Sequence, residues 1–213
     1  MVEAQATVHI IEDDEIDREF LSFKLRAFGF DVAEYSSATS FLDALASLPP
    51  VGCLVLDLQM PGMNGLELQA EMRERSADFP IVFLSGMAKV ADATQAMRNG
   101  ALDLMEKPPD VDLLCQTLQR GLKLSEDALE AGSALRDIHS QLDKLTPRER
   151  EVLPYVYQGW SLKEITSHFE FTFATAARHQ NRILDKLKVA NPTQLVRKLQ
   201  AANIEITVDQ PDA

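Results

Sequence analysis

Short apolar runs alternate with amphipathic stretches through the first half of the chain. Several of the apolar runs are hydrophobic on both faces, which is typical of parallel strands that helices cover on both sides. The pattern predicts five βα repeats and therefore a doubly wound parallel sheet. The predicted strands are 8–11, 31–35, 53–56, 81–84 and 102–105, and the predicted helices lie near 15–28, 37–47, 64–75, 89–99 and 110–122.

From Leu145 onward the pattern is helical throughout. Thr146, Pro147 and Glu149 form a helix start, with a capping residue, a proline at the first position and an acid three residues after the cap. Further helices are predicted over 161–169, from the cap Thr172 to Val189, and over 191–203. Two short helices before a basic third one are typical of a helix-turn-helix, although any small four-helix domain that binds protein fits the same pattern.

The stretch between these two regions carries leucines and one isoleucine at helical spacings, interrupted at Gly121 and at 131–133. We interpret 1–122 as one domain, 123–141 as a partly helical linker and 142–213 as a second domain. The apolar stripe could be a dimeric coiled-coil seam, but sustained heptads are missing. Packing of the stripe on its own domain is therefore the favoured interpretation.

Charge is divided unevenly along the chain. The 213 residues carry a net charge of −12, yet residues 1–143 hold 11 basic and 25 acidic side chains, whereas residues 144–198 hold 10 basic and 5 acidic ones. The asymmetry suggests an acidic module joined to one that can approach phosphate groups.

No apolar run approaches the length of a membrane span, and the first residues lack the basic start of a signal peptide. A cytoplasmic protein without membrane contact is therefore expected. Cys53 and Cys115 are far apart and flanked by apolar residues, which favours buried, reduced thiols.

Polar residues fall at the carboxyl ends of the predicted strands, where ligands of such sheets bind. Any one of them could be an ordinary loop residue, but all converge on one edge. Clustered carboxylates repel one another unless a cation neutralises them, and oxygen ligands suit Mg²⁺. A lysine and a hydroxyl can bind a phosphoryl group, and a carboxylate can be its acceptor. The residues are Glu12, Asp13, Asp57, Ser85 and Lys107.

Four motifs in this order, IIEDD, LVLDLQMPGMNGLEL, VFLSG and MEKP, resemble the signature of response-regulator receiver domains over about residues 7–122. The resemblance implies a flavodoxin-like fold and an Mg²⁺ cofactor. It further implies that Asp57 accepts the phosphoryl group, that Glu12, Asp13, Asp57 and the backbone carbonyl of Gln59 bind the metal, and that Ser85 and Lys107 contact the phosphoryl group. Two positions depart from the family pattern: Leu104 replaces the switch aromatic, and Pro109 replaces a phenylalanine.

The motifs TPRERE, KEI and KLKV, with a histidine in the third helix, resemble the LuxR/FixJ-type DNA-binding domain over about residues 142–205. Glu170, Ala174, Ala177 and Gln180 depart from the residues usual in the family, so its base preference does not transfer. Arg178 and Asn181 are the candidate base readers, because arginine pairs with guanine and asparagine with adenine. The candidate phosphate contacts are Lys163, Thr175, His179, Arg182 and Lys186.

The whole chain resembles a FixJ-type response regulator. The resemblance implies a transcription factor that a sensor histidine kinase phosphorylates, that dimerises when phosphorylated and that binds promoter DNA, with RNA polymerase as a further possible partner. It would be no enzyme beyond its own aspartyl phosphorylation and dephosphorylation. Two alternatives stay open: an output domain that mainly binds protein, and a regulator independent of phosphorylation.

Overall fold

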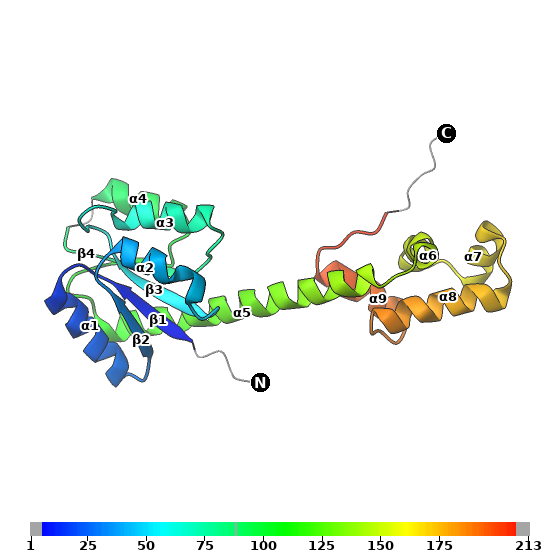
Figure 1. Cartoon of the computed structure of the whole chain (residues 1–213), viewed down its shortest axis with the longest axis horizontal. Helices are drawn as coiled ribbons and strands as arrows, with labels where there is room; N and C mark the ends of the chain where they lie inside the picture. Colours follow the sequence, from blue (N-terminus) through cyan, green and yellow to red (C-terminus); the bar gives the residue numbers. More distant parts are fainter. Residues whose placement is uncertain (1–5, 88, 208–213) are drawn as a thin grey trace. The chain divides into compact units, whose positions relative to one another are not determined.

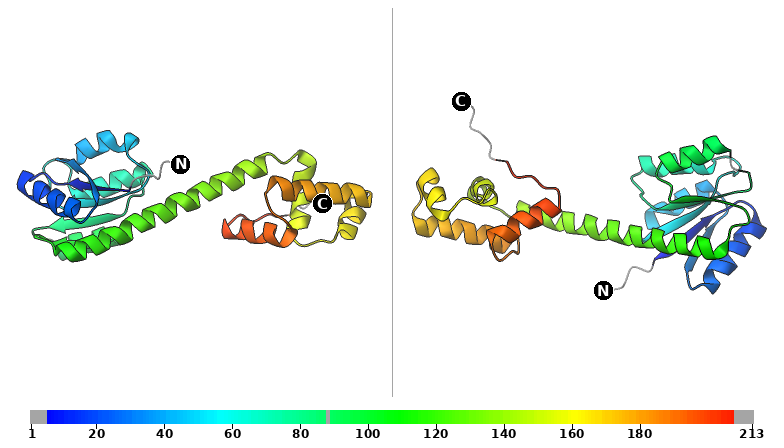
Figure 2. Two further views of the ribbon diagram at one scale, coloured as in Figure 1. Left: turned by 90° about the horizontal axis from the view of Figure 1, so that it is seen from below. Right: turned by 180° about the vertical axis from the view of Figure 1, so that it is seen from behind.

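The computed structural model describes residues 6–87 and 89–207. The ends of the two predicted domains, 1–5 and 208–213, lie outside the described residues. The chain divides into two compact units, residues 1–130 and 131–213. The first has a hydrophobic core on each face of its sheet, and the second has one core. Figures 1 and 2 colour both units along the sequence.

The first unit is built on a five-stranded sheet whose strands are all parallel, in the order β2-β1-β3-β4-β5. This confirms the sheet expected from the apolar runs. The strands are β1 (Thr7–Ile11), β2 (Asp31–Tyr35), β3 (Gly52–Asp57), β4 (Ile81–Ser85) and β5 (Asp103–Glu106).

Helices cover both faces of the sheet, which explains why β3 and β4 are buried along their whole length. Leu25 of α1 (Glu15–Ala27) and Leu118 of α5 (Val111–Asp143) share one core with Val55. Phe41 of α2 (Ala38–Ala44) and Leu68 of α3 (Gly65–Glu74) share the other core with Leu56, one position further along β3. Neighbouring residues of a strand face opposite sides, so one strand serves both cores. The helices are α1 (Glu15–Ala27), α2 (Ala38–Ala44), α3 (Gly65–Glu74) and α4 (Val90–Arg98), with the short 3-10 helix η1 (Leu45–Ser47) after α2.

The helix α5 runs without a break over Val111–Asp143. The segment 123–141, which the sequence predicts to be a partly helical linker, is therefore helical throughout. The backbone continues as helix through Gly121 and Gly132, so these glycines interrupt the apolar stripe without ending the helix. Among the described helices, none is long and apolar enough to cross a membrane.

The second unit packs four further helices around Ile138 and Leu142 from the end of α5. Its buried core includes Val152, Ile165 and Leu195. The packing of the apolar stripe on its own domain, favoured over a coiled-coil seam, holds for these residues. The helices are α6 (Pro147–Tyr157), α7 (Leu162–Phe169), α8 (Phe173–Lys186) and α9 (Pro192–Ala201).

Candidate functional site

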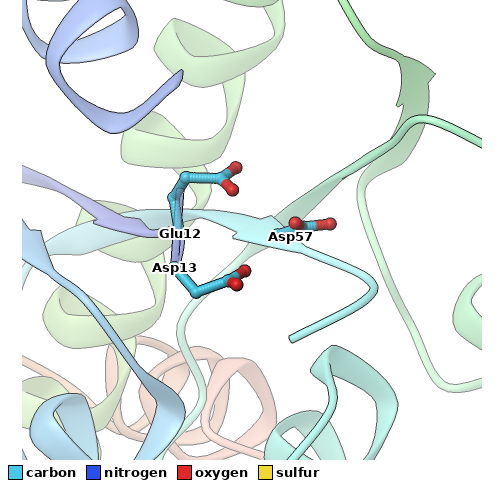
Figure 3. Close-up of side chains that lie close together, drawn as sticks. All are labelled: Glu12, Asp13 and Asp57. Carbon is cyan, nitrogen blue, oxygen red and sulfur yellow. The ribbon is translucent and has the colours of Figure 1, made fainter. Parts of the chain in front are cut away.

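Three carboxylates meet at the carboxyl edge of the sheet, beyond β1 and at the end of β3 (Figure 3). Glu12, Asp13 and Asp57 each place a carboxylate oxygen within 4.8 Å of the others. Glu12 and Asp57 are buried and Asp13 is exposed, so one side of the cluster faces solvent. The cluster is an all-oxygen group that could hold a divalent cation.

Lys107, which follows β5, reaches into this cluster. Its Nζ lies 2.5 Å from Oε2 of Glu12 and 3.0 Å from Oδ2 of Asp57. The other oxygen of Asp57, Oδ1, accepts a hydrogen bond from the backbone amide of Gln59 at 3.0 Å. The lysine therefore supplies the positive charge that the neighbouring carboxylates require.

The acidic cluster shifts the ionisation of its members. Burial, reinforced by the neighbouring charge of Asp57, raises the pKa of Glu12 to about 7 despite its hydrogen bond from Lys107. Burial alone would lower the pKa of Lys107, but its hydrogen bonds to Glu12 and Asp57 and their charges raise that pKa instead. Lys107 therefore stays charged, and the site holds more negative charge than one lysine balances.

Two residues of α1 that the sequence did not single out also shape this edge. Oδ2 of Asp17 lies 3.2 Å from Nζ of Lys107. Arg18 donates to the backbone carbonyls of Glu12, at 2.9 Å, and Asp13, at 3.3 Å, and so fixes the loop that carries both acids. Both residues lie in the first turn of the helix that follows the acidic loop. That position could have indicated from the sequence that their side chains reach back to the loop.

Gly65, the first residue of α3, allows that helix to approach Asp57 closely. A Cβ at Gly65 would lie 2.5 Å from the carbonyl oxygen of Asp57 and 2.9 Å from Phe83. Asn64 caps the helix in a reciprocal capping box with Glu67. The close contact between α3 and the end of β3 therefore explains the second glycine, Gly65, of the motif GMNGLEL.

Of the remaining predicted receiver residues, Ser85 and Pro109 lie near this edge, and Leu104 lies within β5. Ser85 ends β4 and is fully buried, and its Oγ accepts from the amide of Met87 at 3.3 Å. Leu104 is half-buried and packs against the core under α2, α3 and α4. Pro109 lines a small pocket of about 200 Å³ with Asp17 and Lys107.

The second unit presents a helix-turn-helix formed by α7 and α8. Ser161 caps α7 in a capping box with Glu164, and Thr172 caps α8 by accepting from the amide of Thr175 at 3.2 Å. Between the helices, Glu170 adopts the left-handed conformation with φ 55° and ψ 33°. The resemblance implies a small polar residue or glycine at this position, and glycine takes this conformation without strain.

One face of α8 is exposed and polar, and the opposite face is buried. Arg178, Asn181 and Arg182 are exposed, as is Lys163 at the start of α7. These four candidate DNA contacts are free to meet a ligand. The buried face, which packs on the other helices of the unit, consists of Ala176, Ile183, Leu184 and Leu187.

Three other predicted DNA contacts have partners inside the protein. Nζ of Lys186 lies 2.6 Å from Oε2 of the buried Glu149 and 2.9 Å from the carbonyl oxygen of Lys144. This placement differs from the expected phosphate contact, because the ammonium compensates a buried carboxylate. The ring of His179 lies against Phe171, with centroids 5.2 Å apart, and the hydroxyl of Thr175 is 2.8 Å from that of Thr172.

An aromatic cluster surrounds the turn between α6 and α7. Tyr155 contacts Trp160, His168 and Phe169 with ring centroids 4.6–5.1 Å apart. Arg148 lies over Phe169, 5.1 Å from the ring centroid. The cluster joins α6 to α7 and so helps to hold the helix-turn-helix in shape.

Comparison with known proteins agrees with both halves of this description. Residues 8–119 match the response regulator receiver domain family, and residues 143–199 match the luxR family of bacterial regulatory proteins. The chain therefore belongs to the response regulators that join a receiver domain to a LuxR-type DNA-binding domain. It is a DNA-binding transcriptional regulator activated by phosphorylation. The receiver domain implies a kinase partner.

Among individual proteins, the chain is similar to the transcriptional regulatory protein FixJ of Bradyrhizobium diazoefficiens, with 32% identity over 92% of this chain and 96% of that protein. The response regulator protein TmoT of Ectopseudomonas mendocina is 33% identical over 92% of this chain and 89% of its own length. A solved structure of the response regulator StyR matches with a TM-score of 0.84 and 32% identity, over 93% of this chain and 100% of StyR.

Proposed function

We propose that Asp57 is the residue that accepts the phosphoryl group, with a sensor histidine kinase as its donor. One carboxylate oxygen of Asp57 forms a bond to phosphorus while the phosphorus–nitrogen bond of the donor phosphohistidine breaks, and the imidazole nitrogen keeps the electron pair. The observation that carries the proposal is the burial of Asp57 between Lys107, at 3.0 Å, and the carboxylates of Glu12 and Asp13.

The residues fit a bound Mg²⁺. Glu12, Asp13 and Asp57 form an oxygen-only set of the kind this ion prefers, and the cluster holds more negative charge than Lys107 balances. The backbone carbonyl of Gln59 is proposed as a fourth ligand. When bound, the ion would neutralise both the carboxylates and the oxygens of the phosphoryl group. Lys107 would then move from the Asp57 carboxylate to a phosphoryl oxygen, and the hydroxyl of Ser85 would donate to another.

Arg178 and Asn181 are proposed as the base readers of promoter DNA, and Lys163 and Arg182 as phosphate contacts. Support comes from their exposure on the helix-turn-helix and from the basic balance of residues 144–198. We further propose a homodimer after phosphorylation, contact with RNA polymerase at the promoter and a cytoplasmic location. Apart from phosphorylation and dephosphorylation of its own aspartate, the protein would catalyse no reaction.

The phosphoacceptor is tested by incubating the full-length protein with a small phosphodonor and Mg²⁺ and measuring the intact mass. We expect a mass increase of one phosphoryl group that survives acid and is lost in base. Asp57→Asn should abolish the increase, because the amide is not a nucleophile. Asp43→Asn, a change of an exposed aspartate on α2, is the matched control and should label normally. Equal labelling of Asp57→Asn would contradict the assignment.

A further inference from the structure

The ammonium of Lys107 is shared by three carboxylates, and one of them lies outside the proposed metal site. Nζ of Lys107 lies 2.5 Å from Oε2 of Glu12, 3.0 Å from Oδ2 of Asp57 and 3.2 Å from Oδ2 of Asp17. An ammonium group has three N–H donors, so three carboxylates are as many partners as it can serve directly. A phosphoryl oxygen that approaches Lys107 therefore competes with these carboxylates.

Asp17 differs from the other two carboxylates in its position. It belongs to α1, and its side chain is 49% exposed. It is not part of the cluster of Glu12, Asp13 and Asp57, whose carboxylates point toward one another in Figure 3. Within the part of the chain that the structure describes, Lys107 is the ion-pair partner of its carboxylate. Asp17 therefore acts on the site through this lysine and through its own charge.

Phosphorylation changes the balance among the three carboxylates. In the proposed reaction, the carboxylate of Asp57 becomes an acyl phosphate, and Glu12 becomes a ligand of Mg²⁺. Asp17 takes part in neither step and keeps its full charge. It is therefore the carboxylate that competes with the phosphoryl oxygens for the ammonium, and its negative charge also repels them.

The surroundings of Asp17 and Lys107 leave room for a change of partners. Both side chains line a pocket of about 200 Å³, together with Pro109. Side chains that border open space can shift without disturbing a close-packed core, whereas side chains inside such a core cannot. The contact between Asp17 and Lys107 can therefore form and break while the sheet and its helices stay in place.

We propose that Asp17 is a positioning residue that competes with the phosphoryl group for Lys107 and so weakens the hold of the site on that group. The proposal rests on the proposed phosphorylation of Asp57. It adds a residue of α1 that sets the stability of the phosphorylated state.

The test measures how tightly the full-length protein binds beryllofluoride, an anion that attaches to a carboxylate in the geometry of a phosphoryl group, at saturating Mg²⁺. Asp17→Asn should bind the anion about two- to fivefold more tightly than the wild type, the range expected for a half-exposed ion pair. The same variant should bind Mg²⁺ no more tightly than the wild type, because it has lost a negative charge. Isothermal titration calorimetry measures both affinities. A site that was merely damaged would bind both ions more weakly.

Two further variants assign the effect to the carboxylate beside Lys107. Asp17→Glu restores the charge and should bind beryllofluoride as the wild type does. Glu19→Gln is the matched control, because Glu19 is exposed on the same helix but lies outside the ion pairs of Lys107. It should leave the affinity for beryllofluoride unchanged. Circular dichroism confirms that each variant is folded.

Three results would overturn the proposal. The first is an affinity of Asp17→Asn for beryllofluoride that equals the wild-type value or falls below it. The second is a gain in Glu19→Gln or Asp17→Glu as large as that in Asp17→Asn. The third is a wild-type protein that binds no beryllofluoride in the presence of Mg²⁺, which alone would also overturn the proposed phosphorylation site. The first two results leave that site standing, so the two failures are distinguishable.

Discussion

Lys107 has three carboxylate partners in this structure and is expected to change them during the reaction. Its ammonium lies between Glu12 and Asp57, with Asp17 3.2 Å away. A lysine in this place holds the carboxylates together before phosphorylation and is available to a phosphoryl oxygen afterwards. Metal binding needs only the carboxylates, so the two functions can be separated by mutation.

Lys107→Ala should therefore still bind Mg²⁺, at least as tightly as the wild type, because removing the cation leaves the carboxylates more negative. The variant should lose the conformational change that follows phosphorylation. Isothermal titration calorimetry with Mg²⁺ measures the first property. Asp13→Ala is the control that should lose the metal. A loss of affinity in Lys107→Ala as large as that in Asp13→Ala would contradict this division of roles.

His9 in the middle of β1 is a buried base with an unmet polar atom. It is 1% exposed, its ring contacts Tyr35, Phe41 and Phe79, and within the described chain its Nε2 has no hydrogen-bond partner. Burial lowers the pKa of His9 from 6.5 to about 4. The folded protein thus holds the neutral imidazole, whereas the unfolded chain takes up a proton near pH 6.5.

The free energy of unfolding should therefore be at its full value above about pH 6.5 and should fall as the pH drops from there toward about 4, where the folded histidine also protonates. By pH 5 the loss from His9 alone would be about 2 kcal/mol. Urea denaturation followed by circular dichroism at pH 7.5 and pH 5 measures it. His9→Phe, which removes the titrating group, should flatten the dependence. An equal slope in that variant would assign the effect to other groups.

At the scale of elements, α5 depends on one glycine where it crosses the sheet. A Cβ at Gly121 would lie 2.6 Å from Sγ of the buried Cys53 and 3.0 Å from Leu102, so β3 and α5 approach each other at this point. At Gly132, further along the same helix, the nearest atom to an added Cβ is a guanidinium nitrogen of Arg136 at 3.5 Å. Close packing therefore requires a glycine at position 121, whereas no close contact requires one at position 132.

Gly121→Ala should lower the free energy of unfolding by about 1–3 kcal/mol, because the core must shift to admit the methyl group. Gly132→Ala should raise it by about 0.5–1 kcal/mol, since alanine favours the helix and meets only ordinary contacts. Urea denaturation of both variants beside the wild type gives the comparison. Equal effects of the two substitutions would show that the contact with Cys53 does not constrain α5.

Most elements and the receiver site could be predicted because they follow from local patterns. The carboxyl ends of parallel strands lie at one edge of a sheet. The positions of Asp57, Ser85 and Lys107 at the ends of apolar runs therefore predicted that they share that edge. The contacts of Asp17 with Lys107 and of Glu149 with Lys186 could not be predicted from the sequence, because they depend on how elements far apart in the chain pack together. The unbroken α5 was missed because a single glycine costs a helix only about 1 kcal/mol, which the strong helix formers around Gly121 and Gly132 offset. Cys53 and Cys115 were correctly predicted to be buried free thiols.

For the whole molecule, the uneven distribution of charge suits the two parts of the chain to binding partners of opposite charge: a cation for the first part and DNA phosphates for the second. Residues 1–143, which include the carboxylate cluster of Glu12, Asp13 and Asp57, carry an excess of acidic side chains. Residues 144–198 carry an excess of basic side chains. Within the second unit, however, not every basic residue is available to DNA. Arg182 is exposed, whereas Lys186 is held by the buried Glu149.

The two residues should therefore affect DNA binding differently. Arg182→Ala should reduce the slope of log affinity against log salt concentration by about one, as expected when one phosphate contact is lost. Lys186→Ala should leave that slope unchanged and instead destabilise the second unit by on the order of 2 kcal/mol, because Glu149 stays buried without its partner. Binding isotherms at several salt concentrations and thermal unfolding separate the two effects. If the folded Lys186→Ala variant showed a smaller slope of log affinity against log salt concentration, Lys186 would be a DNA phosphate contact after all.

The aromatic cluster between α6 and α7 gives the protein a built-in optical signal. Trp160 is the single tryptophan of the chain and lies 4.7 Å from Tyr155 and 5.5 Å from His168, centroid to centroid. Its emission therefore originates in the DNA-binding unit alone, without an attached dye. Changes in the helix-turn-helix can be followed by selective excitation at the red edge of the absorption band, while the tyrosine of the first unit stays dark.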